Sequence, residues 1–275
     1  MEREGSQPND HGARSQTTTS HLPGTLYVVS TPIGHPDDIT LRALAILRRV
    51  TIIASEDPRV TQTLLAHHGI TATVTSYGPL NRHEKMLVLL HQLIQGQDIA
   101  LVSDNGTPVI YDPGSLFVAA AHQAGIPVMA IPGPSVLTAA AAISGFSGDA
   151  IVFEGHLPST NRRLTQYLSQ LRHERKTLIF YLNPKALSGL LRIMTKIFPT
   201  RQTVIALNLT TNKEALSRGK PSELLDQLGP VARDSAVTVV IEGYRGRVSD
   251  RITQKKVESK IAPRYSSSRR RISTR

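Results

Sequence analysis

The segment Thr25-Leu-Tyr-Val-Val-Ser-Thr-Pro-Ile-Gly34 joins a short apolar run to a loop that contains Pro and Gly. Residues 25–30 are almost continuously apolar, which is typical of a β-strand buried on both faces of a parallel sheet. The loop stands where a dinucleotide-binding domain carries G-x-G-x-x-G, and that glycine pattern is absent from it. The segment therefore predicts a buried strand of an α/β fold and argues against an ordinary dinucleotide-binding domain.

Short apolar runs and segments of helical spacing alternate from residue 25 to residue 241. This alternation predicts α/β layering, with room for antiparallel strands late in the chain. The expected strands are 25–30, 50–54, 99–103, 127–131, 151–153, 177–181, 203–207 and 236–241. The expected helices are 40–49, 60–67, 87–95, 116–124, 135–143, 161–171, 185–196 and 222–228.

The cluster Ile131-Pro-Gly-Pro-Ser135 is the best candidate for a domain boundary, because Pro and Gly interrupt regular structure near the middle of the chain. A length of 275 residues, at roughly 150 residues per domain, agrees with two domains. We therefore expect an N-terminal domain over 23–132 and a C-terminal domain over 133–243.

The net charge of +11 is concentrated at the C-terminus. Residues 245–275 contain eleven Lys and Arg against two acidic residues, the first 22 residues carry a net charge of −1, and the residues between keep about +3. A basic block with Ser-rich spacers is typical either of a disordered arm that pairs with phosphates or of a solvated terminus that aids solubility. We therefore expect disordered tails over 1–22 and 244–275.

The composition excludes several classes of site. The absence of cysteine excludes disulfides, thiolate zinc sites, iron–sulfur clusters and a cysteine nucleophile. No apolar run is long enough to span a bilayer, and the first twenty residues lack the basic and then apolar pattern of a secretory signal. These features predict a soluble cytoplasmic protein without a membrane partner.

The motifs of several common enzyme classes are also absent. The chain has no Walker A sequence, no G-x-S-x-G elbow and no H-E-x-x-H helix. Its ten histidines show no convincing ligand spacing, and we interpret His67-His68 as the end of a helix. We therefore predict no metal site.

Four loops that directly follow expected strands share small residues, Gly, Pro and a carboxylate or hydroxyl group. They are Ser30-Thr-Pro-Ile-Gly34, Glu56-Asp-Pro-Arg59, Ser103-Asp-Asn-Gly-Thr-Pro108 with Tyr111-Asp-Pro-Gly114, and Pro132-Gly-Pro-Ser135. In an open α/β sheet, ligands bind beyond the carboxyl ends of the strands, where such loops meet. Gly permits close backbone approach, and a carboxylate such as Asp104 accepts hydrogen bonds from a ribose or an amino group. The loops together predict a ligand cleft.

These loops are parts of longer motifs that occur in order along the chain. The motifs are Gly24-Thr-Leu-Tyr-Val-Val-Ser-Thr-Pro-Ile-Gly34, Asp38-Ile-Thr-Leu-Arg-Ala-Leu44, Glu56-Asp-Pro-Arg59, Ser103-Asp-Asn-Gly-Thr-Pro108, Asp112-Pro-Gly114, Pro132-Gly-Pro-Ser135 and Phe153-Glu-Gly155. Together they closely resemble the bacterial ribosomal RNA small subunit methyltransferase I family, over about residues 23–243. The resemblance implies two α/β domains of the tetrapyrrole-methylase-like (class III) methyltransferase fold, with S-adenosylmethionine in the cleft between them. It also implies a homodimer that methylates the 2′-oxygen of a cytidine ribose in 16S rRNA of the small ribosomal subunit.

The resemblance implies roles for residues on the matched loops. The cofactor-binding residues are expected to be Thr31, Pro32, Ile33, Gly34, Ser103, Asp104, Gly106, Thr107, Pro132, Gly133, Pro134, Ser135 and Tyr181. Asp104 and Glu56 are the expected catalytic residues, and Arg59, Asp112 and Lys185 are expected to bind substrate. Any of Glu56, Asp57 and Asp104 can serve as the base or hold the cofactor, and we favour for Asp57 a pairing with Arg59 at a helix start.

Two segments depart from the family pattern. Phe180-Tyr-Leu-Asn-Pro-Lys-Ala186 stands where the family shows Phe-Tyr-Glu-Ser-Pro-His-Arg, and Leu207-Asn-Leu-Thr-Thr211 stands where it shows Arg-Glu-Leu-Thr-Lys. Charged groups are lost in both segments. Two alternative functions therefore stay open: a methyltransferase of the same fold acting on a tetrapyrrole or another small molecule, and a non-catalytic RNA-binding or ribosome-assembly protein that retains the pocket.

Overall fold

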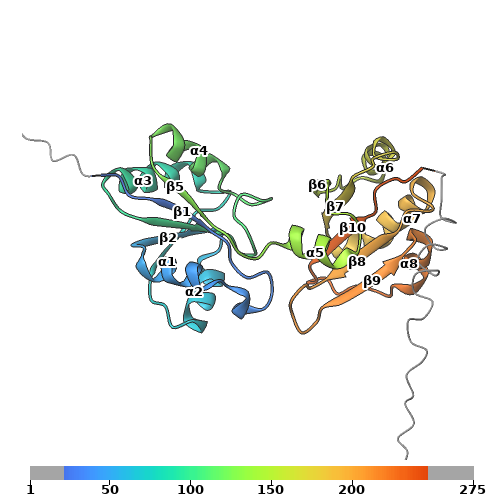
Figure 1. Cartoon of the computed structure of the whole chain (residues 1–275), viewed down its shortest axis with the longest axis horizontal. Helices are drawn as coiled ribbons and strands as arrows, with labels where there is room; N and C mark the ends of the chain where they lie inside the picture. The colour runs from blue at the N-terminus through green and yellow to red at the C-terminus, as the bar shows by residue number, and fades with distance from the viewer. Residues whose placement is uncertain (1–21, 247–275) are drawn as a thin grey trace, which may run out of the picture. The chain divides into compact units, whose positions relative to one another are not determined.

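The computed structural model describes residues 22–246, which form two compact units (Figure 1). Unit 1 contains the described residues up to Ala139 together with the segment Leu209–Asn212, and unit 2 contains the remainder. The division falls within helix α5 (Val136–Ser144), after the boundary that we predicted at residue 132. The predicted domain limits stay a prediction, and the predicted tails, apart from Leu22 and residues 244–246, lie outside the described residues.

Unit 1 is built on a parallel sheet with the strand order β3-β2-β4-β1-β5. The strands are β1 (Leu26–Val29), β2 (Ile52–Ser55), β3 (Thr73–Ser76), β4 (Ile99–Val102) and β5 (Val128–Ile131). β1 is paired on both sides, because Leu26 lies opposite Ile99 in β4 and opposite Val128 in β5. All five strands point the same way, so their carboxyl ends lie at one edge of the sheet.

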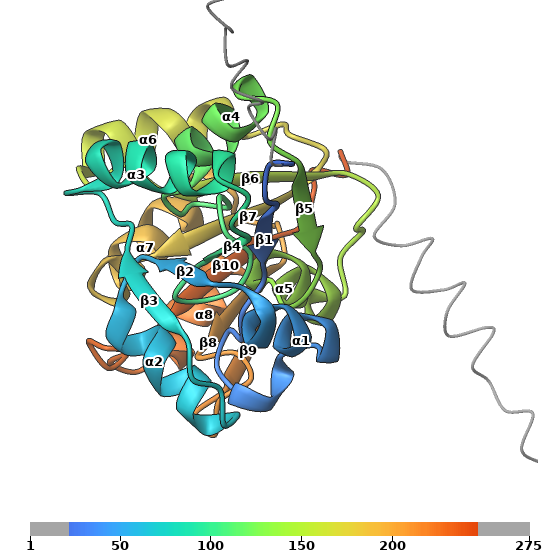
Figure 2. The same ribbon diagram turned by 90° about the vertical axis from the view of Figure 1, so that its left-hand side faces the viewer.

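Two pairs of helices cover the two faces of this sheet (Figure 2). The helices are α1 (Leu41–Arg49), α2 (Pro58–His67), α3 (Arg82–Ile94) and α4 (Ser115–Gln123). Alternate residues of β4 face opposite cores: Ala100 packs with the α1 and α2 side, and Leu101 packs with the α3 and α4 side. This explains why the strands read as continuous apolar runs in the sequence.

Side-chain caps begin the two helices beside the strand-end loops. Thr40 Oγ1 accepts a hydrogen bond from the N–H of Ala43 at 3.1 Å at the start of α1. Asp57 caps α2, which has Pro58 at its first position. Asp37 and Asp38 form the separate short 3₁₀ helix η1 (Pro36–Asp38), which precedes α1. The polar oxygen at residue 40 makes it the cap, and α1 begins after it.

Unit 2 contains a mixed sheet with the strand order β6-β7-β10-β8-β9. The strands are β6 (Ile151–His156), β7 (Thr177–Leu182), β8 (Thr203–Leu207), β9 (Ala215–Gly219) and β10 (Val237–Ile241). β6 and β7 are parallel, whereas β10 runs antiparallel to both β7 and β8, and β9 runs antiparallel to β8. Antiparallel strands late in the chain agree with the sequence pattern.

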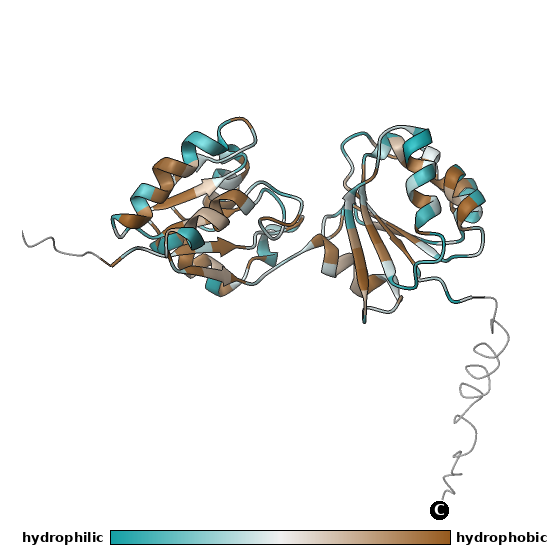
Figure 3. Ribbon diagram, turned by 90° about the horizontal axis from the view of Figure 1, so that it is seen from above, coloured by the Kyte–Doolittle hydropathy of each residue, from teal (hydrophilic) through white to brown (hydrophobic). Residues whose placement is uncertain are grey.

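Helices supply the rest of the core of unit 2, and Figure 3 shows the strands of both units as largely hydrophobic. The helical elements are α6 (Asn161–Gln170), η2 (Pro184–Ala186), α7 (Leu187–Ile197) and α8 (Pro221–Gln227). Leu168 of α6, Leu190 of α7 and Leu224 of α8 are buried against Phe180 of β7. The aliphatic and phenylalanine side chains thus form a core without tryptophan.

The sequence pattern missed two strands and the start of one helix. β3 and β9 lie at sheet edges and are largely half-buried or exposed, so their sequences, Thr-Val-Thr-Ser and Ala-Leu-Ser-Arg-Gly, carry little apolar pattern. α3 begins at Arg82 rather than at residue 87, because its first residues are polar and exposed. No helix among residues 22–246 is both long and apolar enough to cross a bilayer.

Candidate active site

The loops that follow β1, β4 and β5 are joined by hydrogen bonds at the carboxyl edge of the parallel sheet. Thr31 donates from its N–H to Gly106 O at 2.9 Å and from Oγ1 to Ser103 O at 2.9 Å. Thr107 Oγ1 lies 3.0 Å from Ser30 Oγ and donates to Pro134 O at 3.1 Å. The predicted convergence of these loops is confirmed, and their role in ligand binding stays a prediction.

Two glycines let the backbones in this region approach closely. A Cβ atom on Gly133 would lie 2.9 Å from Ser30 Cβ, closer than such atoms pack. Gly106 has a φ of +88°, and a Cβ atom there would lie 3.2 Å from Ile33 Cγ2. Neither position has room for a side chain, so glycine at both positions lets the loops pack this closely.

A cavity of about 360 Å³ opens beside these loops within unit 1. Its lining includes four residues that we expected to bind cofactor, namely Pro32, Gly34, Ser103 and Asp104. α2 contributes Thr61 and His67 to the opposite wall. Thr31, by contrast, is 2% exposed and supports the wall from behind through its hydrogen bonds. The volume lies in the range of small-molecule sites.

Asp104 joins the loop after β4 to the loop after β2. Its Oδ1 accepts a hydrogen bond from the N–H of Asp57 at 3.0 Å. Partial burial raises the pKa of Asp104 above its usual range, and the nearby carboxylates of Glu56 and Asp57 raise it further, while the Asp57 N–H opposes this. The structure therefore places Asp104, our predicted catalytic residue, in the cavity wall with an elevated affinity for a proton.

Asp112 and Glu56 form a carboxyl pair behind this wall. Ser103 Oγ donates to Asp112 Oδ1 at 3.0 Å, whereas Asp112 Oδ2 is buried and accepts no hydrogen bond while both acids are ionised. One proton between the two acids resolves this, since a protonated carboxyl can donate to the other. Burial, followed by the hydrogen bond and charge of Glu56, raises the pKa of Asp112 to about 7. The Asp112 carboxyl therefore keeps its proton to a much higher pH than an exposed aspartate does.

Asp57 is occupied by its own helix. Its Oδ1 accepts from the N–H of Arg59 at 2.9 Å, and its Oδ2 lies 3.4 Å from Arg59 Nη2. The N–H of Arg59 is the main reason why the pKa of Asp57 is lowered. Our interpretation of Asp57 as a cap paired with Arg59 is confirmed. The Arg59 side chain is 90% exposed, and its role toward substrate stays a prediction.

The two remaining predicted residues belong to unit 2. The ring of Tyr181 in β7 packs edge-on against Phe153, with the ring centroids 4.9 Å apart, and burial raises the pKa of its hydroxyl. Lys185 lies in η2, where its N–H donates to Asn183 Oδ1 at 3.1 Å. Lys185 also lines a cavity of about 530 Å³ together with His156 and Asn161. The roles of Tyr181 and Lys185 stay predictions.

Sequence reasoning missed two features of this site. Ser30, 2% exposed, was placed in a strand-end loop but not among the expected cofactor-binding residues. The pairing of Glu56 with Asp112 was also missed, because the two acids lie on loops after different strands and no spacing rule joins them. Asp112 was expected to bind substrate, and that role stays a prediction.

Comparisons with known proteins agree on one family. The model of the Tetrapyrrole (Corrin/Porphyrin) Methylases matches residues 25–225. The Ribosomal RNA small subunit methyltransferase I of Thermotoga maritima is 39% identical over 80% of this chain and 99% of its own length. The protein of the same name from Synechocystis is 45% identical over 71% of each chain. The uroporphyrin-III C-methyltransferase of Thermus thermophilus, complexed with S-adenyl homocysteine, has the same fold, with a TM-score of 0.57 at 17% identity over 80% of this chain and 97% of that one.

Proposed function

The chain belongs to the tetrapyrrole methylase family and, within it, to the ribosomal RNA small subunit methyltransferase I proteins, and from this premise we propose that it transfers a methyl group from S-adenosylmethionine to the 2′-oxygen of a cytidine ribose in 16S rRNA. The structural observation that carries the proposal is the cluster of Glu56, Asp104 and Asp112 beside the Gly/Pro loops of unit 1. Their carboxylates can accept hydrogen bonds from the hydroxyl groups of a ligand and attract its positive charge.

The residues at this edge of unit 1 fit S-adenosylmethionine. When bound, this cofactor supplies an electrophilic methyl group on a positively charged sulfur. The exposed backbone of Gly133 suits close contact with the adenosyl moiety, and Gly106 lets its loop pack against Ile33. The carboxylate of Asp104, which lines the cavity, suits ribose hydroxyls or an amino group. Ser103 and Thr107 add hydroxyl groups beside the same loops. We assign cofactor binding to these residues, with Pro32, Gly34, Pro132 and Ser135 beside them.

The carboxyl groups provide a place for the proton that the ribose hydroxyl loses. A general base works best when its pKa lies near the operating pH, so an acid with a raised pKa suits the role. Asp104 lines the cavity and has a raised pKa. We propose that Asp104 or Glu56 accepts the hydroxyl proton and that Asp112 holds Glu56 in position through the hydrogen bond between the two acids. In this role Asp112 is a positioning residue.

The RNA requires cations outside the carboxylate cluster. Arg59 presents an almost fully exposed guanidinium next to the cluster, which suits a phosphate of the RNA backbone. Lys185 offers a second cation in unit 2. The basic residues 245–275 add phosphate-binding charge in our proposal. We further propose that the protein acts as a cytoplasmic homodimer, which sedimentation of the purified protein tests.

A methylation assay tests the proposal. Purified full-length protein is incubated with isolated small ribosomal subunits and S-adenosylmethionine carrying a labelled methyl group, and modified ribose is mapped by mass spectrometry of 16S rRNA fragments. We expect one labelled cytidine. Label on a base, on a tetrapyrrole offered in competition, or on no substrate at all contradicts the proposal.

Calorimetric titration with S-adenosylmethionine separates the alternatives. Binding without transfer to RNA favours the small-molecule methyltransferase or the non-catalytic RNA-binding protein, for which the lost charges in residues 180–186 are the supporting observation. Absence of binding leaves only the non-catalytic protein.

A further inference from the structure

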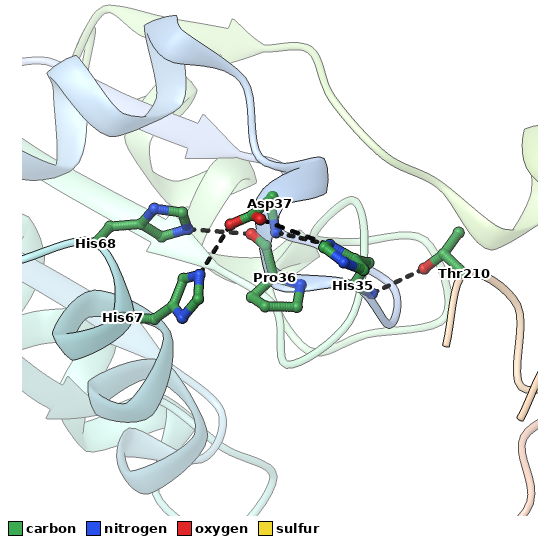
Figure 4. A network of polar contacts seen from close by, with 6 residues as sticks. All are labelled: His35, Pro36, Asp37, His67, His68 and Thr210. Atoms are coloured by element: carbon green, nitrogen blue, oxygen red, sulfur yellow. Dashed lines mark hydrogen bonds and ion pairs between the residues drawn. The ribbon is translucent and has the colours of Figure 1, made fainter. Parts of the chain in front are cut away.

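Asp37, His67 and His68 form a cluster at the edge of unit 1 that the proposed reaction does not use (Figure 4). His67 Nε2 lies 2.8 Å from Asp37 Oδ1. One potential ligand atom from each of the three side chains lies within 4.8 Å of the other two. Two imidazoles and one carboxylate are a donor set that Zn²⁺ accepts, and three protein ligands leave one tetrahedral position for water.

The fold holds the cluster together from two sides. Asp37 belongs to η1, whose first turn is fixed because His35 Nδ1 accepts the N–H of Asp37 at 3.3 Å. His67 is the last residue of α2 and His68 is its C-terminal cap. His68 Nε2 lies 3.1 Å from Pro36 O, so the helix end is also bonded to the backbone of the turn. The three donors thus converge through two anchored backbone segments.

The site is reachable from solvent. The Asp37 side chain is 64% exposed and that of His67 is 46% exposed, so an ion enters from solvent. Donor atoms around a tetrahedral zinc ion lie about 3.3 Å apart, given bonds of about 2.0 Å. The donors must therefore move closer together than in the ion-free structure, and exposed side chains can do so by changing rotamer at low cost.

Although the histidine spacing predicted no metal site, we propose that Asp37, His67 and His68 bind a divalent transition-metal ion, with Zn²⁺ as the favoured ion, beside the cavity that His67 also lines. In the ion-free state the same groups form a hydrogen-bonded pair and a contact with Pro36 O. Metal binding replaces the contact between His67 and Asp37 with coordinate bonds. The argument for the metal does not rest on methyl transfer, because none of these three residues belongs to the carboxylate cluster.

Titration of the metal into the chelator-treated full-length protein tests the site. We expect one equivalent of Zn²⁺ to bind with a Kd in the micromolar range or below, and Co²⁺ to give the visible absorption of a nitrogen-coordinated ion in the same position. Asp37→Asn and His68→Gln each remove one donor and should weaken binding by at least about tenfold. His122→Gln, which changes an exposed histidine of α4 outside the cluster, is the matched control and should bind as the unaltered protein does.

Thermal unfolding supplies a second readout that a loss of fold cannot imitate. Zn²⁺ bound only by the folded state raises Tm, and the rise grows with the logarithm of the free Zn²⁺ concentration divided by Kd. We expect this rise in the unaltered protein and in His122→Gln, and its loss in Asp37→Asn and His68→Gln, all four having similar Tm values without metal. Equal zinc affinity in all four proteins, or no binding at millimolar Zn²⁺, overturns the proposal.

Discussion

The sheets of the two units place polar groups in different ways. In unit 1 all strands are parallel, and buried hydroxyl residues gather at the one edge where the strands end, at Ser30, Thr31, Ser55 and Ser103. In unit 2, β10 runs antiparallel to both of its neighbours, so the ends of the central strands alternate between opposite edges. A parallel sheet thus collects its loops into one polar site, whereas an antiparallel centre disperses them.

The buried ionisable side chains of the two units also have different roles. In unit 1, burial and neighbouring acids raise the pKa values of Asp104 and Asp112, and that of Asp112 reaches about 7. In unit 2, Arg201 donates to Glu242 O at 2.5 Å and to Leu171 O at 3.1 Å, and its guanidinium lies over the Phe198 ring. Burial lowers its pKa to about 10, which still leaves it charged at neutral pH. The buried acids of unit 1 thus have an increased affinity for protons, whereas the buried arginine of unit 2 stabilises the fold through hydrogen bonds to the backbone.

The largest expected effect tests the chemical role of the carboxylates in unit 1. Asp104→Asn keeps the shape of the side chain and its hydrogen bond from the Asp57 N–H but removes a proton acceptor. We expect the methylation rate on small ribosomal subunits to fall by about 10²- to 10⁴-fold. Asp226→Asn, an exposed acid of α8, is the control and should keep the full rate. An unchanged rate for Asp104→Asn together with Glu56→Gln removes both from the mechanism.

The next effect tests the structural role of the buried charge in unit 2. Arg201→Met fills part of the volume but removes the side-chain donor to Glu242 O and to Leu171 O, of which Leu171 O keeps the N–H of Glu174. We expect the free energy of unfolding to fall by about 2–4 kcal/mol, measured by urea denaturation. The rate per folded molecule should stay the same. A loss of rate without a loss of stability contradicts the assignment of Arg201 to folding.

The pH dependence of the free energy of unfolding tests the raised pKa of Asp112. Its pKa is raised to about 7, so the folded protein keeps a proton that the unfolded chain has already released. The free energy of unfolding therefore falls as pH rises from about 4 to about 7. Asp112→Asn imitates the protonated acid and removes this fall, so above pH 7 it should be more stable than the unaltered protein by about 1–2 kcal/mol, after allowance for solvent screening. Parallel stability profiles from pH 4 to pH 8 contradict a shared proton.

The smallest effect concerns Asp57, which lies in the same region but serves its helix. Asp57→Ala removes the cap of α2 and the contact with Arg59, and should lower the free energy of unfolding by about 1 kcal/mol. Asp57→Ser keeps an oxygen for the cap and should restore most of the loss. If Asp57→Ser keeps stability yet loses methylation as severely as Asp104→Asn, Asp57 belongs to the chemistry as well.

The buried strands of unit 1 could be predicted from the sequence because both of their faces pack against helices. Leu26, Ile99 and Leu101 lie in one core while Tyr27 and Ala100 lie in the other, so every position favours an apolar residue. The edge strands β3 and β9 lack that double constraint and were missed. The same reasoning placed Ser103 and Asp104 in a ligand site, since both follow a buried strand directly.

The sequence by itself determined the α/β alternation, the strand-end loops and the family, because each depends on residues that are near neighbours in the chain or on motifs in fixed order. Tertiary structure alone decided which groups face one another. Glu56 meets Asp112 only because parallel strands return separate loops to the same edge, and Asp37 meets His67 only because the C-terminal end of α2 lies beside η1. Burial then changes the chemistry of the groups that meet, since removing a carboxylate from water raises its pKa, and burial is a property of the packed chain rather than of any residue within it.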